Sequence, residues 1–368
     1  MRLNSLLFLS IGIGGFACGG GDAKDDTSSQ DTGDTEDTEE TGDTEETGDT
    51  EDTETGEPLS AEEQQAADAY NAFRDGLPEA DLTDAEAMSL WAQGSAPMVF
   101  VQALLPSILV SDHISTWQAA GNTGVPDCPV LTGYDENGQA AGLETSAEGG
   151  CTDHDGVEWL GKTSQYMAGG GVVLLNEGFG TSTLSDVCMG KEDVFTIHSY
   201  AVWTFAEDGG SDSMDIVSAL NTTSHDPNKS CEPVEEGSAL KVVLDRATVE
   251  LESGGEETTW NHVGQASYKS ADRSGNLDIE TVDEVTNDTI CQSEAVSGST
   301  LFTTSAHEAA IHYDGATDCS EESTVTWTLD GADQGELTGI SCSSTTRGRS
   351  MLNTVLGLSL LLVFRRRD

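Results

Sequence analysis

Apolar residues recur at helical spacing where the part of the chain that can fold begins. Ser60 and Glu63 form a capping box, in which a serine oxygen and a glutamate three residues later satisfy free N–H groups at a helix N-terminus. The apolar positions that follow are Ala66, Ala69, Tyr70, Phe73 and Leu77. This spacing predicts an amphipathic helix that ends at Gly76 and Pro78.

The next apolar segments continue the helical pattern. Thr83 and Glu86 repeat the capping box and predict a second helix. Residues 96–110 are strongly apolar but contain Pro97 and Pro106. Because proline interrupts a helix, this segment favours a buried pair of helices over a membrane span.

From Cys128 onward the apolar residues alternate with polar ones, as in half-buried strands. One parity of the segment around residue 200 holds Phe195, Ile197, Ala201, Trp203 and Phe205. A second alternating set is Val325, Trp327 and Leu329. A third set starts at Leu240, Val242 and Leu244 and changes parity at Asp245 and Arg246. This change predicts a bulge or turn there.

Turn signals separate these strands. Asn-Gly or Asp-Gly pairs stand at 137–138, 155–156, 314–315 and 330–331, and such pairs favour tight hairpins. About ten antiparallel strands are expected. The predicted fold class is mainly β, an antiparallel sheet, sandwich or open barrel over residues 121–342, with a small α-helical N-terminal region over residues 60–120.

Residues 1–17 have the pattern of a signal peptide. A short apolar run follows Arg2, the only charge before Cys18, and is too short for a permanent membrane span. The segment Gly14–Cys18 resembles the lipobox of bacterial lipoproteins. That resemblance implies that Cys18 is lipidated and becomes the N-terminus, with membrane lipid as a partner. The alternative is an ordinary signal peptide, which would leave Cys18 as a thiol or a disulfide partner.

Residues 18–59 form an acidic tether. The segment 22–57 repeats Asp, Thr, Glu and Gly, with 17 acidic residues and one lysine. Such a sequence lacks the apolar side chains that would offset an ordering entropy of about 1 to 2 kcal/mol per residue, so we expect disorder. It would act as a spacer, with weak binding of calcium or a cationic polymer as the alternative.

Residues 343–368 form a hydrophobic tail. The apolar run Met351–Phe364 would span about 21 Å as a helix, less than a hydrocarbon core of about 30 Å. Arginines close the run at 365–367, and Cys342 precedes it. This arrangement resembles the C-terminal sorting signals of exported myxobacterial proteins, which implies a sorting role for Cys342 and removal of the tail. A short anchor helix is the alternative.

The chain is strongly acidic, with 67 acidic and 15 basic residues and a net charge of −52. Outside the tether, Arg2 and the tail, residues 58–346 retain 49 acidic and 8 basic residues, a net charge of −41. Nucleic-acid binding depends on clustered lysine and arginine, so nucleic acid is excluded as a partner. Self-repulsion on this scale favours a salty or calcium-rich habitat.

Seven cysteines besides Cys18 favour disulfides in an exported chain. The disulfide candidates are Cys128, Cys151, Cys188, Cys231, Cys291 and Cys319. Pairing of neighbours joins 128 with 151, 188 with 231, and 291 with 319. The alternative joins Cys319 to Cys342, and the sequence leaves both open.

Motifs for catalysis are weak. His307, Glu308 and His312 lack the four-residue histidine spacing of a zinc-protease helix, and their neighbours alternate as in a strand. No GxSxG elbow occurs. Asp153 and Asp155 match only the start of a calcium loop. We therefore expect no catalytic residue and no cofactor, with calcium at these two aspartates as the one metal hypothesis.

Cysteine, Asp-Gly and tryptophan patterns over residues 128–342 resemble those of uncharacterised envelope lipoproteins of myxobacteria and relatives, a resemblance that implies no activity. The sequence thus predicts a lipid-anchored protein of the cell envelope, at the outer membrane or cell surface. Its expected role is non-catalytic binding of an envelope or extracellular ligand, or a structural role. The alternative is an exported hydrolase whose site is assembled in space from acids and His225, His262 or another histidine.

Overall fold

The computed structural model describes residues 60–85, 88, 96–168, 170–185, 188–206, 210–252, 255–270, 273–287, 295–313 and 324–338. Several predicted features lie outside the described residues. They are the signal peptide, Cys18, the tether, most of the second helix, the Asp-Gly turn at 314–315, Cys291, Cys319, Cys342 and the C-terminal tail. These features stay predictions.

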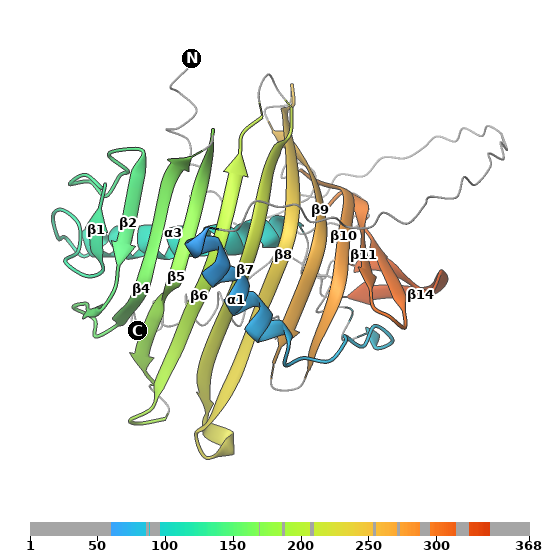
Figure 1. Ribbon diagram of the computed structural model, residues 1–368, viewed down its shortest axis with the longest axis horizontal. Coiled ribbons are helices and arrows are strands. Elements are labelled where there is room, and N and C mark those ends of the chain that lie inside the picture. The colour runs from blue at the N-terminus through green and yellow to red at the C-terminus, as the bar shows by residue number, and fades with distance from the viewer. Residues whose placement is uncertain are drawn as a thin grey trace, which may run out of the picture.

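The described strands form one open antiparallel sheet of 14 strands, in which each strand of the main path pairs with its neighbour in the chain (Figure 1). β3 pairs only with β4. The first seven strands are β1 (Val130–Thr132), β2 (Glu144–Glu148), β3 (Cys151–Thr152), β4 (Glu158–Ala168), β5 (Gly171–Leu184), β6 (Glu192–Thr204) and β7 (Asp212–Asp226). The others are β8 (Glu232–Glu250), β9 (Glu256–Lys269), β10 (Ser274–Asn287), β11 (Ser297–Thr303), β12 (Glu308–His312), β13 (Thr324–Leu329) and β14 (Ala332–Thr338). The predicted mainly β, antiparallel fold class is confirmed.

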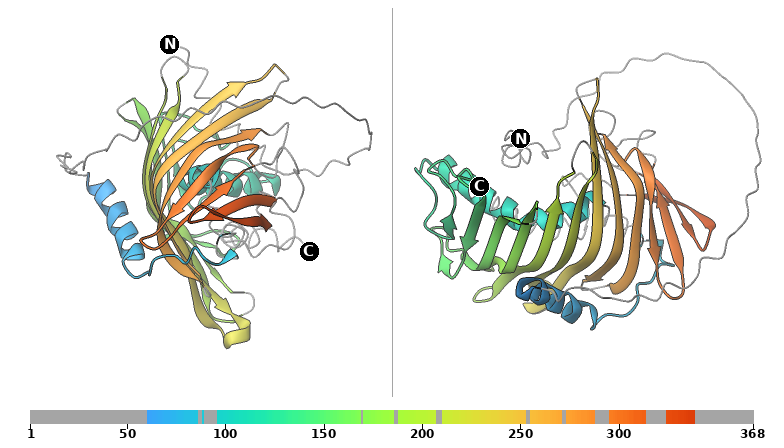
Figure 2. Two further views of the ribbon diagram at one scale, coloured as in Figure 1. Left: turned by 90° about the vertical axis from the view of Figure 1, so that its right-hand side faces the viewer. Right: turned by 45° about the horizontal axis from the view of Figure 1, so that its top comes forward.

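The sheet is curved, and the two described helices lie on opposite faces of it (Figure 2). Helix α1 (Ala61–Arg74) lies on the convex face, and helix α3 (Ala96–Ala119) lies on the concave face. We call the concave side the inner face and the convex side the outer face. A single sheet with a helix on each side gives the protein two separate apolar layers.

Helix α1 forms as the capping box predicts. The Oγ atom of Ser60 accepts a hydrogen bond of 3.1 Å from the backbone N–H of Glu63. On the outer face, Ala66 and Tyr70 are buried against residues of β7 and β8, among them Val217. The hydroxyl of Tyr70 donates to Oε1 of Gln265 on β9 at 3.0 Å, which extends the contact of the helix to the next strand.

Helix α3 is one continuous helix, so the predicted pair of helices is wrong. Pro106 lies inside it, where a proline removes a backbone hydrogen bond and costs about 3 kcal/mol or more. Burial on both sides of the proline offsets that cost, because each buried large apolar side chain contributes about 1.5–3 kcal/mol. The buried apolar side chains of α3 are Val99, Ala103, Leu104, Leu105, Val110 and Ile114.

The apolar core lies mainly on the inner face. Its larger part joins the first half of α3 to β5–β14, and its smaller part joins the second half of α3 to β2, β4, β5, β6 and β7. The alternating strands predicted around residues 195–205 and 325–329 are present as β6 and β13, with Ile197 and Trp327 buried. Asp330 and Gly331 both have positive φ, at 50° and 75°, as a two-residue hairpin requires.

Strand β8 runs without interruption from Glu232 to Glu250, so the predicted bulge or turn at Asp245 and Arg246 is wrong. Its register with β7 and β9 has no shift. The parity of the apolar residues changes because the inner face becomes polar there: Arg246 lies on it, beside Trp260. Val249 then faces outward and is 60% exposed.

The register does shift in β10, between Val282 and Val285. Asp283 has a φ of 49°, and its N–H donates to Oδ1 of Asn261 at 2.8 Å. The extra residue of this bulge returns Glu284 to the inner face opposite Trp260. The bulge therefore places a carboxyl side chain beside Trp260, on the side away from Arg246.

Neither described helix combines the length and the apolar character needed to cross a membrane.

Candidate ligand-binding site on the inner face

Polar side chains gather on the inner face of β8–β12, beside the start of α3. Register places His262 of β9 opposite Leu244 of β8 and opposite Thr281 of β10. Thr281 in turn lies opposite Thr300 of β11. The next row of the same face holds Arg246, Trp260 and Glu284. We call the following residues the inner polar cluster: Arg246, Trp260, His262, Thr281, Glu284, Thr300 and Tyr313.

One side of the cluster satisfies its own hydrogen bonds. The hydroxyls of Thr281 and Thr300 lie 2.6 Å apart, and the Thr300 hydroxyl lies 3.0 Å from that of Tyr313. All three side chains are buried. Buried hydroxyls that bond to each other avoid the cost of desolvation, so this side of the cluster is a closed polar network.

His262 differs from this network because no described residue bonds to it. The side chain is 3% exposed, and neither Nδ1 nor Nε2 has a hydrogen-bond partner among the described residues. Burial lowers the pKa of His262 to about 4, so the ring is neutral at pH 7. A neutral imidazole carries one donor and one acceptor, and each unsatisfied group costs about 1–3 kcal/mol when buried.

Arg246 lies diagonally from His262 and is held by aromatic rings. Its guanidinium carbon lies 5.4 Å from the ring centroids of both Phe100 and Trp260. The Nε atom of Arg246 is buried without a hydrogen-bond partner, and no ion pair of the described residues includes this side chain. Phe100 also packs edge-on against Trp203 at 5.2 Å. Arg246 thus packs over two aromatic rings and has no carboxylate partner among the described residues.

Glu284 adds a carboxyl group to the cluster. It is 2% exposed on the same face, brought there by the bulge of β10. Trp260, between Glu284 and Arg246, donates from Nε1 to the hydroxyl of Thr286 at 3.0 Å. Buried titratable groups gathered in this way are typical of functional sites.

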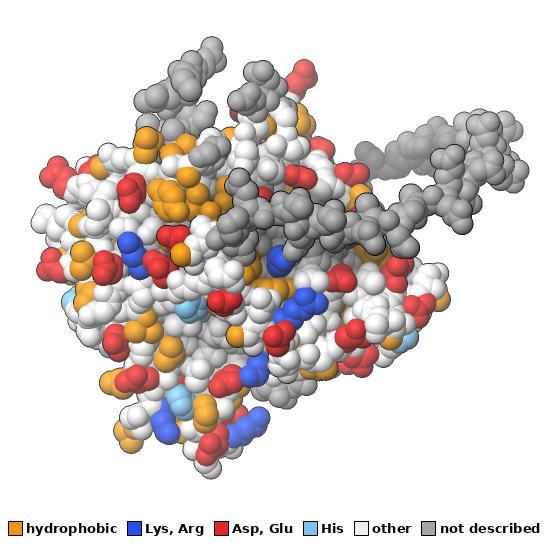
Figure 3. Space-filling model, viewed as in Figure 1, with side chains coloured by type: hydrophobic (Ala, Val, Ile, Leu, Met, Phe, Trp, Pro, Cys, Tyr) orange, Lys and Arg blue, Asp and Glu red, His pale blue; other side chains and the backbone are white. Residues whose placement is uncertain are grey.

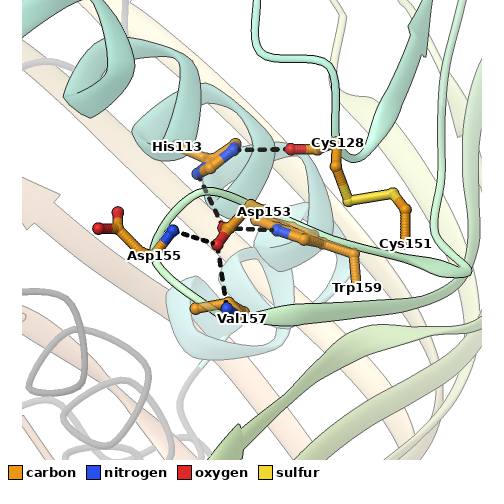
Figure 4. Close-up of a disulfide and its surroundings, with 7 residues drawn as sticks. All are labelled: His113, Cys128, Cys151, Asp153, Asp155, Val157 and Trp159. Carbon is orange, nitrogen blue, oxygen red and sulfur yellow. Dashed lines mark hydrogen bonds and ion pairs between the residues drawn. A yellow bond between two sulfur atoms is a disulfide. The ribbon is translucent and has the colours of Figure 1, made fainter.

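Two of the predicted disulfides are present. Cys128 bonds to Cys151, and Cys188 bonds to Cys231, as the pairing of neighbours predicts. The first disulfide links the segment before β1 to β3, beneath the second half of α3 (Figure 4). Both lie away from the inner polar cluster and brace the earlier strands of the sheet.

The calcium candidate Asp153 is engaged by protein donors (Figure 4). Its Oδ1 accepts the backbone N–H groups of Asp155 and Val157 at 2.9 and 3.0 Å, and its Oδ2 accepts Nε1 of Trp159 at 3.0 Å. Within the described ranges, no group of three or more His, Cys, Asp or Glu side chains is placed to hold a metal. Calcium at Asp153 and Asp155 stays a prediction.

Asp153 also faces a histidine of α3. Oδ2 lies 3.8 Å from Nδ1 of His113, whose Nε2 lies 2.9 Å from the carbonyl oxygen of Cys128 (Figure 4). Burial lowers the pKa of His113, and the Cys128 hydrogen bond and the Asp153 charge oppose that shift. Because both ring nitrogens face protein groups, this histidine locks α3 to the disulfide and leaves no nitrogen for a substrate.

The other histidines named from the sequence lie apart from one another. His307 pairs with Asp330 at 2.9 Å on the surface, while His312 is exposed on β12, as the strand pattern predicts. His225 places Nδ1 3.2 Å from Oδ1 of Asp193, beside the second disulfide. No serine or threonine hydroxyl of the described residues bonds to His225 in this structure. The described contacts therefore assemble no nucleophile with a histidine base.

The sequence named His262 only as one possible histidine of a hydrolase and missed Arg246 as a site residue. The signal that could have found them is parity. Trp260 and His262 alternate with outward-facing residues in β9, and Arg246 continues the inner parity of Leu244 in β8. The Glu284 position had no such signal, because the bulge that turns it inward depends on pairing with another strand.

Comparison of the chain with protein-family models, with curated proteins and with solved structures gives no match.

Proposed function

We propose that this protein is an exported, lipid-anchored binding protein of the cell envelope, whose inner polar cluster holds a small ligand. The observation that carries the proposal is that His262 is only 3% exposed and that neither of its ring nitrogens bonds to a described residue. A buried polar group without a partner is costly, and a ligand that bonds to it removes the cost. Ligand sites combine an apolar wall with a few such polar groups.

The surroundings of His262 favour binding over catalysis. The threonine and tyrosine hydroxyls of the cluster bond to one another at 2.6 and 3.0 Å. No described hydroxyl bonds to the imidazole, as an activated nucleophile would. The aromatic side chains of Phe100, Trp203 and Trp260 supply an apolar wall. This arrangement provides recognition without an evident reacting group.

Location outside the cytoplasm is supported by the two disulfides, which form and persist in oxidising compartments. The lipobox-like segment before Cys18 and the acidic tether support the anchor. Two or three acyl chains would hold the protein on a membrane, since each buried methylene contributes about 0.8 kcal/mol. Membrane attachment at the outer membrane or cell surface is part of the proposal.

The ligand is tested by native mass spectrometry of the protein isolated from membranes in mild detergent. A small molecule retained by the wild type, and lost in His262→Leu, supports the proposal. His312→Gln is the matched control, because His312 is exposed on the outer parity of β12. Wild-type protein that carries no small molecule in any preparation would contradict the binding function.

The anchor is tested separately with Cys18→Ala. This variant should move from the detergent phase to the aqueous phase on detergent partitioning, while the wild type stays in the detergent phase. Equal partitioning of the two would remove lipidation from the proposal and leave ligand binding intact.

A hydrolase is the second candidate, and the observation that favours it is the contact of His225 with Asp193 at 3.2 Å. A carboxylate that orients an imidazole is one part of a catalytic triad. This candidate predicts that the protein hydrolyses an ester, glycoside or peptide and that His225→Gln abolishes the activity. An activity unchanged in that variant would exclude His225 as the catalytic histidine.

A further inference from the structure

The charge on the inner polar cluster identifies a class of ligand, an inference that rests on the proposed binding function. Arg246 and His262 occupy diagonal positions on neighbouring strands, where residues of an antiparallel pair lie about 7–8 Å apart. Both present nitrogen atoms without a partner among the described residues. Two nitrogen groups at this separation can both reach the oxygens of one small acceptor.

An unpaired arginine is unexpected in so acidic a protein. Residues 58–346 carry 49 acidic and 8 basic side chains, so carboxylates are abundant. Lys269 pairs with Glu235 at 2.7 Å and Arg273 pairs with Asp84 at 3.2 Å. Arg246 instead lies over two aromatic rings, which hold the guanidinium in place without using its fork of N–H donors. Its Nε has no partner among the described residues, so the guanidinium is available to a carboxylate or phosphate from outside the protein.

We propose that the inner polar cluster binds a small organic carboxylate with a flat apolar body. The carboxylate accepts hydrogen bonds from the guanidinium of Arg246 and from one ring N–H of His262. The body of the ligand packs against Trp260 and Phe100. This geometry uses each unpartnered nitrogen and places the apolar part of the ligand on the aromatic wall.

Charge decides between a carboxylate and a phosphate. Residues 58–346 carry a net charge of −41 and the inner polar cluster contains one guanidinium, so a second negative charge on the ligand would be repelled. A monoanion is balanced by the guanidinium of Arg246. Desolvating a singly charged carboxylate beside Trp260 and Phe100 also costs less than desolvating a phosphate dianion.

The test is isothermal titration calorimetry, in which benzoate or phenylacetate is added to the protein purified in the form that the cells produce. Benzamide and phenylacetamide are the neutral counterparts, and inorganic phosphate is the dianion. We expect both carboxylates to bind, and each amide and phosphate to bind at least 10-fold more weakly. Arg246→Gln should weaken carboxylate binding at least 10-fold, since it removes a charge-assisted bidentate contact.

Arg246→Lys keeps the charge and loses the forked N–H donors, so it should weaken carboxylate binding by a smaller factor than Arg246→Gln. It also serves as a second test in case Arg246→Gln does not fold. Arg74→Gln on the outer face is the control and should leave the affinity unchanged. Equal binding of benzoate and benzamide, no binding of either carboxylate, or an affinity unaffected by Arg246→Gln would each overturn the carboxylate assignment. A small molecule still retained in native mass spectrometry would then keep the binding function, whereas its absence would remove that function as well.

Discussion

Two buried histidines of the protein have opposite surroundings. His113, in the second half of α3, has Nε2 2.9 Å from the Cys128 carbonyl oxygen and Nδ1 3.8 Å from Asp153. His262, on the inner face of β9, has no described partner for either nitrogen. Burial lowers the pKa of both. The difference separates a histidine whose two nitrogens face protein groups from one whose nitrogens face none, and the second is the basis of the proposed ligand site.

The first region is fixed by several bonds at once. Asp153 accepts three hydrogen bonds from Asp155, Val157 and Trp159, and the Cys128–Cys151 disulfide closes the segment. The second region is fixed on one side only, by the threonine and tyrosine hydroxyls. The hydrogen bonds of Asp153 and the disulfide give the first region a structural role, whereas the unpartnered nitrogens of His262 in the second are the basis of the proposed ligand site.

The outer face gives a third environment for comparison. Figure 3 shows Asp and Glu side chains spread over it, with Lys and Arg fewer among them. Exposed valines also occur there, as Val243 and Val263 are 45% and 56% exposed on paired positions of β8 and β9. The inner polar cluster differs from these exposed side chains in that most of its own side chains are buried.

Removal of the first disulfide should have the largest effect. Cys128→Ser with Cys151→Ser opens a loop with a sequence separation of 23, which lowers the free energy of unfolding by about 3.5 kcal/mol in the chain-entropy description. Urea unfolding measures the loss. The affinity of the inner polar cluster for benzoate should stay the same, because the two regions are separate. If the folded double variant lost its affinity for benzoate, the two regions would be coupled, contrary to this prediction.

Acid should act on the second region. The pKa of His262 is about 4 in the folded protein, against an ordinary value of 6.5. Between these values the unfolded chain binds a proton that the folded protein excludes, so stability falls as the pH falls. The loss reaches about 3 kcal/mol at pH 4, at about 1.4 kcal/mol per pH unit.

Unfolding by urea at pH 7 and pH 4 measures this loss. His262→Leu should lose less stability on acidification than the wild type, and His312→Gln should lose as much as the wild type. A His262→Leu protein with the full acid sensitivity would show that His262 does not carry the effect.

Asp153→Asn should weaken the first region by about 1–2 kcal/mol, because an amide has one acceptor oxygen where the carboxylate has two. Loss of the charge also removes an influence that raises the pKa of His113, so that pKa should fall further. A proton NMR titration of the histidines measures the shift. A raised pKa in the variant would contradict the assigned contact.

Ser60→Ala should have the smallest effect. The serine caps α1 on the outer face, and loss of such a cap costs about 1 kcal/mol. Thermal unfolding measures the change. Neither histidine should shift its titration, since α1 lies on the opposite side of the sheet from both. A shift of either would show coupling through the sheet.

Local patterns in the sequence predicted several of these elements. The capping box at Ser60, the alternation in β6 and β13, and the pairing of neighbouring cysteines are confirmed, because each depends on residues close together in the chain. The continuous α3 helix was not predicted, because burial against strands far along the chain, such as β9 with Trp260, outweighs Pro106.

The candidate site depends on non-local pairing, and for this reason the sequence indicated it only in part. His262 meets Thr281 through the register of β9 with β10, and Thr281 meets Thr300 through that of β10 with β11. Arg246 has the parity of the inner face, but the change of apolar parity at Asp245 and Arg246 was interpreted as a bulge or turn. The real bulge, at Val282–Val285, is set by the two neighbouring strands and carries no residue pattern of its own.

The strand order has a consequence for biogenesis. Except at its two ends, every strand on the main path pairs with the one before and the one after it on that path, so the contacts of the sheet join segments that are synthesised one after another. Hairpins can zip together as the polypeptide emerges, without waiting for a distant partner. Helices α1 and α3 come out earlier than the strands they cover. Their docking is therefore a late event of folding, and Phe100 of α3 meets Trp260 only after β9 has joined the sheet.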